Sequence, residues 1–185
     1  QQESIASWED YSRATLHLLD RAGDFGESAL IEVGPGDGAL LGELAKRAAT
    51  VCALDNSEEM LHAAQHNTRE ISNIEYHLGE PKTLIAQRGT FAAAVVNMVL
   101  HHVADPTALV RDTALLLRPG GELIISDLCP HDQAWAREHC GDLWLGFSPE
   151  DLRAWASAAD LKHCAELFFA QRNGFQIQVQ HFKRC

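Results

Sequence analysis

Short apolar runs alternate with stretches of helical periodicity between Ser7 and Gly121. Each run is only a few residues long and mostly apolar, as strands are when both faces of a parallel sheet are covered. Alternation of this kind is typical of a parallel sheet with helices packed on it. The predicted strands occupy residues 29–33, 51–54, 74–77, 91–96 and 122–126.

Helix start and stop signals lie between the predicted strands. The opening helix is expected over residues 5–20, with its apolar side chains on the sheet. Ser57, Asp105 and Ser148 are predicted N-caps, and the last two are each followed by a proline at the first helical position. The Arg-Pro-Gly-Gly stretch at 118–121 is expected to end a helix before the fifth strand.

The last part of the chain has a different pattern. Residues 165–171 and 175–182 contain alternating β-formers on either side of Arg172-Asn173-Gly174. Asn-Gly between such segments is a strong hairpin signal. The predicted fold is therefore α/β: a doubly wound, mainly parallel seven-stranded sheet that ends in an antiparallel β-hairpin.

Length and composition fit one domain over residues 1–185, because 185 residues of which 46% are hydrophobic can fill a single core. The formal net charge of -11 repels phosphate backbones and anionic membranes, so neither is an expected partner. Five cysteines without a C-x-x-C pair favour a reduced, cytoplasmic protein. No apolar run has the length of a membrane span, and the first residues have no signal-peptide pattern.

A glycine-rich turn follows the first predicted strand. Gly34-x-Gly36-x-x-Ala39 satisfies the dinucleotide-binding fingerprint. Asp55 ends the second strand, where an acid that binds a ribose diol would lie. The glycines and this aspartate predict a ligand that carries a ribose and approaches bare backbone.

Two further acidic residues discriminate between a dinucleotide and a positively charged ligand. Glu32 and Asp37 flank the turn and would oppose a bound diphosphate. Two unit charges about 5 Å apart cost roughly 3 kcal/mol at an effective dielectric near 20. With S-adenosylmethionine the interaction with these acids becomes attractive, because its ammonium and sulfonium are positively charged. Its carboxylate can accept hydrogen bonds from the loop amides. A nicotinamide-dependent dehydrogenase is therefore the weaker alternative.

Several stretches together resemble the motifs of class I S-adenosylmethionine-dependent methyltransferases. They are IEVGPGDGAL, ALDNSEEML, the pair Gly79 and Glu80, NMVLHHVADP and LLRPGGELIISD. The resemblance covers nearly the whole chain and implies a Rossmann-like fold. It also implies cofactor contacts from Glu32, Gly34, Gly36, Asp37, Gly38, Asp55, Asn56, Met60, Glu80 and Asn97.

The resemblance assigns roles to some of these residues. The glycines approach the methionine moiety, Glu32 and Asp37 stand near its ammonium, and Asp55 binds the ribose hydroxyls. Met60 packs on the adenine, and Glu80, where many relatives carry Asp, faces its amino group.

The segment at about 128–160 is expected to cover the substrate. Residues 128–152 resemble the methyltransferase portion fused to ArsR-type winged-helix regulators, and the chain is also similar to UbiE-like methyltransferases of small molecules. Asp142 departs from the ArsR-fused branch, which often has His there. The branch implies an upstream DNA-binding domain, and with it an alternative function: a module that senses cofactor or metabolite for a regulator.

The acceptor is predicted to be a small molecule methylated at carbon, oxygen or sulfur. The Asn-Pro-Pro-aromatic signature of amino-methylating relatives is absent, since NMVL stands in its place. A sulfonium is already activated, so a general base is optional. His131 and His102 are the catalytic candidates. Aromatic residues of the covering segment could wall an apolar acceptor pocket or pack in the core: Trp135, Trp144, Phe147 and Trp155.

Other ligands and partners receive less support from the sequence. The spacing of His131, Asp132, His139 and Asp142 matches no established metal motif, so no metal site is predicted. Arsenite as acceptor would need more paired thiols than Cys129 and Cys140 provide. The sequence leaves open whether the protein forms a homodimer.

Overall fold

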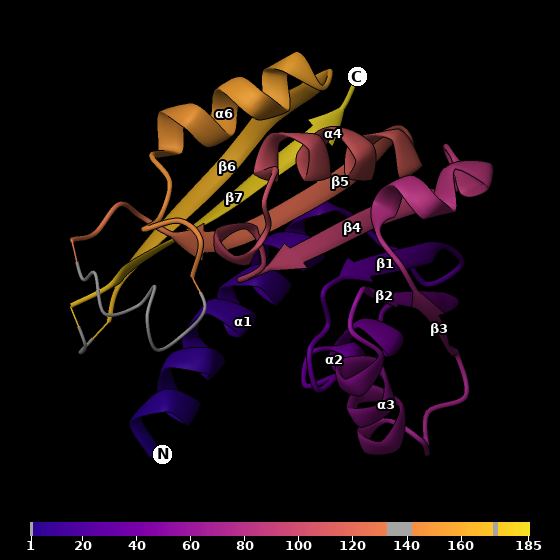
Figure 1. The fold of residues 1–185 in the computed structure, drawn as a ribbon. Coiled ribbons are helices and arrows are strands. Elements are labelled where there is room, and N and C mark those ends of the chain that lie inside the picture. The colour runs from indigo at the N-terminus through magenta and orange to yellow at the C-terminus, as the bar shows by residue number, and fades with distance from the viewer. Residues whose placement is uncertain (1, 133–141, 172–173) are drawn as a thin grey trace.

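The computed structural model describes residues 2–132, 142–171 and 174–185, with side chains from Tyr11 onward. A seven-stranded sheet of order β3-β2-β1-β4-β5-β7-β6 forms its middle layer (Figure 1). The strands are β1 (Ala29–Val33), β2 (Thr50–Asp55), β3 (Ile74–Leu78), β4 (Phe91–Asn97), β5 (Leu117–Leu128), β6 (Leu161–Ala170) and β7 (Gln176–Arg184).

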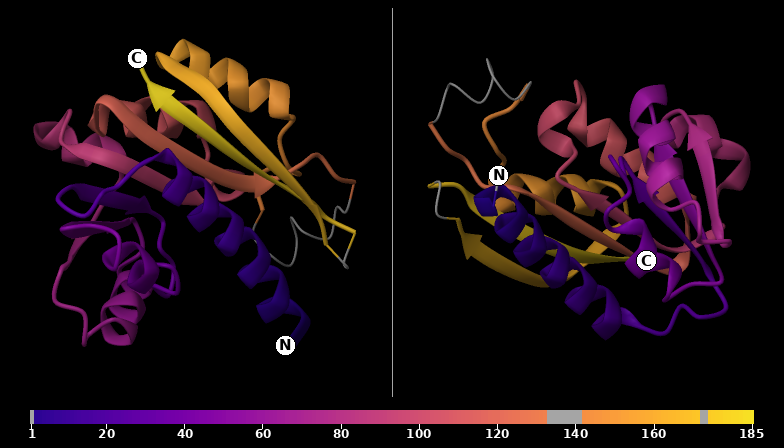
Figure 2. Two further views of the ribbon diagram at one scale, coloured as in Figure 1. Left: turned by 180° about the vertical axis from the view of Figure 1, so that it is seen from behind. Right: turned by 90° about the horizontal axis from the view of Figure 1, so that it is seen from below.

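Helices cover both faces of the sheet. One face carries α1 (Gln2–Ala22), α2 (Leu41–Ala45) and α3 (Glu58–Asn67); the other carries η1 (Pro81–Gln87), α4 (Pro106–Leu116) and α6 (Pro149–Ala158). The short helix η2 (Leu100–His102) follows β4. Figure 2 shows α1 lying across one face of the sheet. No helix in the described part of the chain has the length and apolar character needed to cross a bilayer.

The strand directions confirm the predicted fold class. β1 to β5 pair in parallel, whereas β7 is antiparallel to both β5 and β6. The predicted hairpin is formed by β6 and β7, although residues 172–173 of its turn lie outside the described residues. The predicted N-caps also hold: Ser57, Asp105 and Ser148 each accept a hydrogen bond from a backbone N–H three residues on.

One sequence expectation was wrong in detail. β5 begins at Leu117, not at residue 122, so the Arg-Pro-Gly-Gly stretch lies inside the strand. The pairing of β4 with β5 shifts there, from Phe91 with Leu117 to Ala93 with Glu122, which accommodates the extra residues as a bulge. The helix after β1, α2, is short and ends at Ala45.

Alternate residues of the central strands fill two hydrophobic cores. Leu30 and Ala93 are fully buried on the face of α1, whereas Ile31 and Ala94 are fully buried on the opposite face. This arrangement explains why the strands are apolar at consecutive positions: both faces of the sheet are covered.

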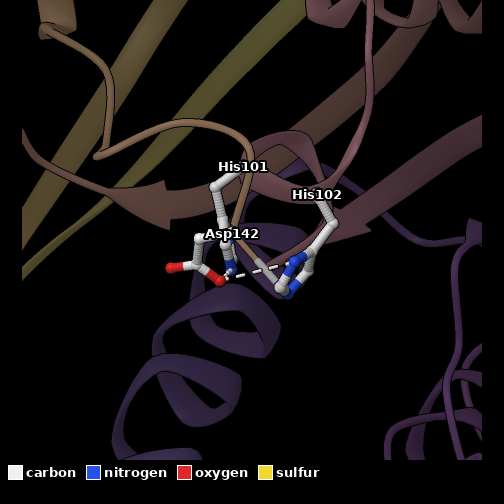
Figure 3. A group of neighbouring side chains, drawn as sticks. All are labelled: His101, His102 and Asp142. Carbon is white, nitrogen blue, oxygen red and sulfur yellow. Dashed lines mark ion pairs between the residues drawn. The ribbon is translucent and has the colours of Figure 1, made fainter. Parts of the chain in front are cut away.

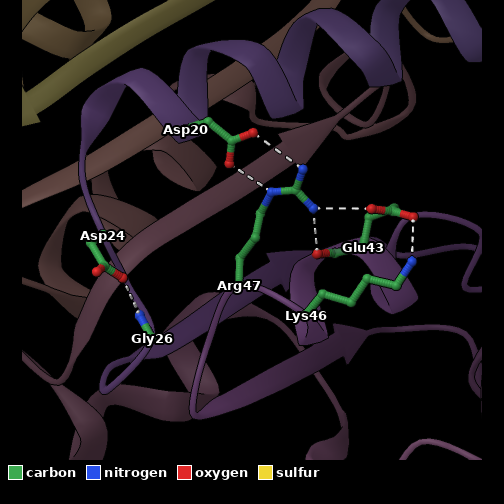
Figure 4. A network of polar contacts seen from close by, with 6 residues as sticks. All are labelled: Asp20, Asp24, Gly26, Glu43, Lys46 and Arg47. Carbon is green, nitrogen blue, oxygen red and sulfur yellow. Dashed lines mark hydrogen bonds and ion pairs between the residues drawn. The ribbon is translucent and has the colours of Figure 1, made fainter.

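A charged cluster fixes α1 against the turn between β1 and β2 (Figure 4). Arg47 donates two hydrogen bonds to Asp20 of α1, from Nε at 2.7 Å and from Nη2 at 3.2 Å. Its third nitrogen donates to Glu43 of α2 at 3.0 Å. Planar two-point contacts of this kind hold geometry better than a single ion pair. The cluster therefore orients the helix that carries Tyr11.

Candidate active site

The glycine turn after β1 brings bare backbone close to two neighbouring elements. Gly34 has a φ of +72°, and a β-carbon there would lie 2.6 Å from a methyl carbon of Val99. Gly38 has a φ of +87°, and its β-carbon would lie 3.1 Å from the Cα of Ala64 in α3. Only glycine meets both conditions, a left-handed backbone and no room for a side chain.

Two cavities meet at Gly34, at the carboxyl ends of the parallel strands. The first, which we call the Asp55 cavity, has a volume of about 270 Å³ and is also lined by Asn56, Glu80 and Asp105. The second, the Glu32 cavity, measures about 320 Å³ and contains most of the other predicted cofactor contacts. Its lining includes Glu32, Gly34, Gly36, Asp37, Met60 and Asn97. Ligands of open α/β sheets bind at this edge.

The structure distributes the predicted contacts unevenly over the two cavities. Met60, expected near the adenine, lines the Glu32 cavity beside Gly36 and not the Asp55 cavity, where Glu80 lies. Gly38 lines neither cavity and instead lets α3 approach the turn. The roles of these residues stay predictions.

Glu32 is a buried acid in the wall of a cavity. Its side chain belongs to β1 and the residue is 2% exposed. Among the described residues, its Oε1 atom has no hydrogen-bond partner. Burial, followed by the nearby charges of Asp55 and Asp37, raises the pKa of Glu32 to about 8. A cation in the cavity would remove this penalty, because it favours the ionised carboxylate.

Asp55 is held in place by backbone groups. Its Oδ1 accepts a hydrogen bond of 3.0 Å from the N–H of Ser57, and its carbonyl oxygen accepts one of 2.8 Å from the N–H of Gly79. Within the described part of the chain, no hydrogen bond engages the second carboxylate oxygen, Oδ2, which is therefore available to a ligand. Glu80, by contrast, is exposed and forms an ion pair with Lys82 at 3.1 Å.

The end of β4 contains a backbone conformation that the sequence did not indicate. Met98 has a φ of +59°, which is unusual for a residue other than glycine, and its N–H donates to the carbonyl oxygen of Ser126 at 2.8 Å. The Ser126 hydroxyl also bonds to the side chain of Asn97. Asn97 and Met98 both line the Glu32 cavity. Strained backbone of this kind clusters at functional sites.

Tyr11 is a further site residue that sequence reasoning missed. It comes from α1 and lines the Glu32 cavity, although its position predicted only packing on the sheet. Burial and the charge of Asp37 raise the pKa of Tyr11 to about 12, so its hydroxyl remains a hydrogen-bond donor at neutral pH. Its helical periodicity gave no sign of this, because α1 is distant in sequence from every motif.

A second polar cluster lies beyond the cavities, where η2 and the end of β5 meet (Figure 3). The Nδ1 atom of His101 is 2.7 Å from Oδ1 of Asp127, and both residues are buried. Asp142 lies 3.7 Å from His101 and 3.4 Å from His102. Burial opposes protonation of His101, but the hydrogen bond and charge of Asp127, together with Asp142, raise its pKa above the ordinary value.

The other acceptor-side candidates lie near this cluster or outside the described residues. The ring of His131 packs edge-on against Phe175, with centroids 4.6 Å apart, and burial lowers its pKa. Neither His131 nor His102 lines the Asp55 cavity or the Glu32 cavity. Of the residues that the sequence analysis names in this segment, Trp135, His139 and Cys140 lie outside the described residues.

The remaining aromatic residues of the covering segment form a continuous cluster. Phe147 is buried, 6.1 Å from Trp144 and 5.4 Å from Trp155 between ring centroids. All three line a further cavity of about 390 Å³ together with Pro130 and Asp151. The three rings thus pack on one another and also line a cavity, and the use of this cavity as an acceptor pocket stays a prediction.

Comparison with known proteins shows similarity to methyltransferases. The chain is 31% identical over 159 residues to a ubiquinone biosynthesis O-methyltransferase from Xanthomonas oryzae pv. oryzae, over 78% of this chain and 65% of that protein. The chain spans between about a third and two thirds of the length of the curated relatives that it matches first.

Solved structures share the fold at low sequence identity. The [4+2]-cyclase SpnF has a TM-score of 0.80 at 16% identity, covering 94% of this chain and 80% of that one. Geranyl diphosphate methyltransferase in complex with S-adenosylmethionine has a TM-score of 0.79 at 16% identity, covering 94% of this chain and 85% of that one. Because a cyclase and a methyltransferase share this architecture, the fold alone does not name the reaction. The family model of the methyltransferase domain, however, matches residues 7–178, and the chain belongs to this family.

Proposed function

We propose that the Asp55 and Glu32 cavities together bind S-adenosylmethionine, and that the domain transfers its methyl group to carbon, oxygen or sulfur of a small molecule. When bound, S-adenosylmethionine supplies an electrophilic methyl group on a sulfonium. Membership of the methyltransferase family supports the reaction class. The relatives named above act, by their names, in ubiquinone biosynthesis and on geranyl diphosphate, which supports a small acceptor.

The observation that carries this proposal is the state of Glu32. A carboxyl that is 2% exposed and lacks a partner for Oε1 in the described structure is costly to ionise. The ammonium group of S-adenosylmethionine offers both a hydrogen bond and a compensating charge. A diphosphate would be repelled by Asp37 and would make ionisation of Glu32 still more costly, which argues against a dinucleotide.

Other residues would complete the cofactor contacts. Asp55 would accept hydrogen bonds from the ribose hydroxyls with the carboxylate oxygen that Ser57 does not use. The turn at Gly34 and Gly36 would leave room for the methionine moiety, since both residues line the Glu32 cavity. Asn97 would stand between cofactor and acceptor.

His131 and His102 remain the candidates on the acceptor side. Both residues lie at the carboxyl edge of β4 and β5, where an acceptor could approach the methyl group. Holding the acceptor in line with the sulfur accounts for most of the catalysis that a sulfonium needs. A proton acceptor is required only for a hydroxyl or a thiol.

Cofactor binding is tested by calorimetric titration with S-adenosylhomocysteine. We expect binding by the wild type and at least about tenfold weaker binding by Glu32→Gln, which removes the charge but keeps the shape. Glu27→Gln, an exposed acid just before β1, is the matched control and should bind as the wild type does. Binding of NAD⁺ without binding of S-adenosylhomocysteine would refute the proposal.

The acceptor is identified by incubating the protein with a methyl-labelled cofactor and a cell extract. Label is expected in a small organic molecule. Label recovered only in protein or nucleic acid would contradict the proposed acceptor class.

The wider assignments have the status of proposals. We place the protein in the cytoplasm, where free thiols such as Cys52 and Cys129 stay reduced. A homodimer, and the sensing role with an upstream DNA-binding domain, stay predictions. Light scattering would measure the mass of the protein in solution and so test the homodimer. The full reading frame of the gene would show whether a DNA-binding domain precedes this one.

A further inference from the structure

Two histidines and one aspartate converge where η2 meets the segment between β5 and α6 (Figure 3). The potential ligand atoms of His101, His102 and Asp142 all lie within 4.8 Å of one another. Asp142 Oδ1 is 3.4 Å from His102 Nδ1 and 3.7 Å from His101 Nε2. These separations exceed the usual N–H···O hydrogen bond of about 2.7–3.2 Å. They are close to the about 3.3–3.6 Å between neighbouring ligands of a tetrahedral ion with bonds of 2.0–2.2 Å.

A fourth residue fixes the orientation of one imidazole. Asp127 accepts a hydrogen bond of 2.7 Å at Oδ1 from Nδ1 of His101, when that nitrogen carries the proton. Its Oδ1 also accepts from the N–H of Leu128, so the carboxylate is itself held in place. This tautomer leaves a lone pair on His101 Nε2, the nitrogen that lies 3.7 Å from Asp142 Oδ1. A carboxylate behind a histidine is the usual outer partner of a metal-bound imidazole.

The charge balance of the cluster favours a cation. Asp127 and Asp142 are 0% and 6% exposed, and within the described part of the chain their ion pairs are with histidines. Two buried carboxylates are costly unless a positive charge compensates them. The group formed by Glu122, Cys164 and His181 differs here, because Lys183 already lies 3.6 Å from Glu122.

We propose that His101 Nε2, His102 Nδ1 and Asp142 bind one divalent transition-metal ion, that Zn²⁺ suits the site best, and that Asp127 is the positioning residue for His101. Two imidazoles and one carboxylate are a ligand set that zinc accepts, with the remaining position open to water or an oxygen ligand. The side chain of His102 is 43% exposed, which gives the ion a path from solvent. None of these residues lines the Asp55 or Glu32 cavity, so metal binding can be measured separately from cofactor binding.

The test is a titration of the chelator-treated protein with Co²⁺, followed by its visible d–d absorption, and then displacement by Zn²⁺ in competition with a chromophoric chelator. The wild type should bind one equivalent. His102→Ala and Asp142→Asn should each weaken Zn²⁺ binding by at least about 100-fold, and Asp127→Asn by about 10–100-fold. His77→Ala, which removes a half-exposed histidine 3.9 Å from Glu75, should leave the affinity unchanged.

Two results would overturn the proposal. One is a wild type that binds Zn²⁺ no more tightly than His102→Ala does. The other is a cobalt spectrum that survives in His102→Ala and is lost in Cys164→Ser, which would assign the ion to the Glu122 group. Because Asp127 and Asp142 are buried, thermal unfolding of each metal-free variant checks that it is folded; the exposed His102 provides the variant least dependent on this check.

Discussion

Gly34 and Val99 lie so close together that a β-carbon on Gly34 would be 2.6 Å from Val99 Cγ2. The contact joins the turn after β1 to the segment after β4, the two chain segments between which the cavities open. Because valine is branched at Cβ and holds one rotamer strongly, its methyl group has little freedom to move aside.

Gly34→Ala should therefore destabilise the protein by about 2–4 kcal/mol, the sum of left-handed backbone strain and overlap with Val99. Gly89→Ala is a matched control, since Gly89 has the same φ of +72° with no atom within 4 Å of its β-carbon position. It should cost only about 1–2 kcal/mol. Urea unfolding measures both, and equal losses would show that the Val99 contact does not matter.

Asp55→Ala should weaken binding of S-adenosylhomocysteine by about 1.5–3 kcal/mol, the usual worth of hydrogen bonds to a charged group. Asp24→Ala is a suitable control, because Asp24 accepts from the N–H two residues on at 2.9 Å, as Asp55 does, but it lies in the loop between α1 and β1 and lines neither cavity (Figure 4). Calorimetric titration with S-adenosylhomocysteine measures the affinity of each variant, and Asp24→Ala should bind as the wild type does. An unchanged affinity in Asp55→Ala would remove its assigned ribose contact.

Binding of the cofactor should depend on pH through Glu32. Its pKa of about 8 means that the ligand-free carboxyl keeps its proton well below that pH. An ammonium favours the ionised form, so binding expels a proton and affinity should rise, by at most about tenfold per pH unit, until it levels off near the free pKa. Calorimetry in buffers of different ionisation enthalpy detects the released proton. Glu32→Gln should abolish the release.

Stability should change with pH in the opposite sense. The folded-state pKa of Glu32 lies above the ordinary carboxyl value of about 4.3, so the folded protein holds the extra proton between these values. The contribution of Glu32 to stability is thus complete below about pH 4 and is lost as pH rises through the folded pKa. Thermal unfolding of the wild type and Glu32→Gln across this range should converge at low pH and diverge at high pH.

His131→Ala should lower turnover more than cofactor affinity, because the residue lies outside the Asp55 and Glu32 cavities, which we propose bind the cofactor. The comparison needs initial rates with the identified acceptor and a binding titration of the same variant. His62→Ala, an exposed histidine on α3, should change neither quantity. Loss of cofactor affinity in His131→Ala would show that the residue contacts the cofactor and not the acceptor.

Strand and helix order could be predicted because the local signals agree with one another. The parallel strands are apolar at consecutive positions, and caps such as Ser57 and Asp105 mark where the helices begin. The start of β5 could not be predicted, because Pro-Gly-Gly normally ends an element. Only pairing with Phe91 across the sheet extends the strand back to Leu117.

The candidate site was predictable where it is contiguous in sequence. Glu32, Gly34 and Gly36 belong to one turn, and Asp55 follows the neighbouring strand, so their convergence could be expected. Tyr11 could not be found in this way, since it reaches the cavity from α1.

The contacts of Asp142 with His101 and His102 were not expected from the sequence. Among the described residues, Asp142 forms ion pairs with these two histidines, and its charge also acts on His131. The order of the strands could have indicated this cluster. β4 and β5 are parallel neighbours in which Asn97 pairs with Ser126, so the residues that follow these two positions lie close together.

The placement of β7 between β5 and β6 has a consequence for synthesis of the protein. β7 follows β6 in sequence, yet it is an interior strand of the sheet and pairs on both sides. A nascent chain that has emerged only as far as β6 therefore exposes the unpaired edge of β5, an edge that can attract other chains. Translation must release residues 176–184 before that edge closes, so ribosomes that stall before residue 176 should yield aggregation-prone products although every predicted cofactor motif has already been made.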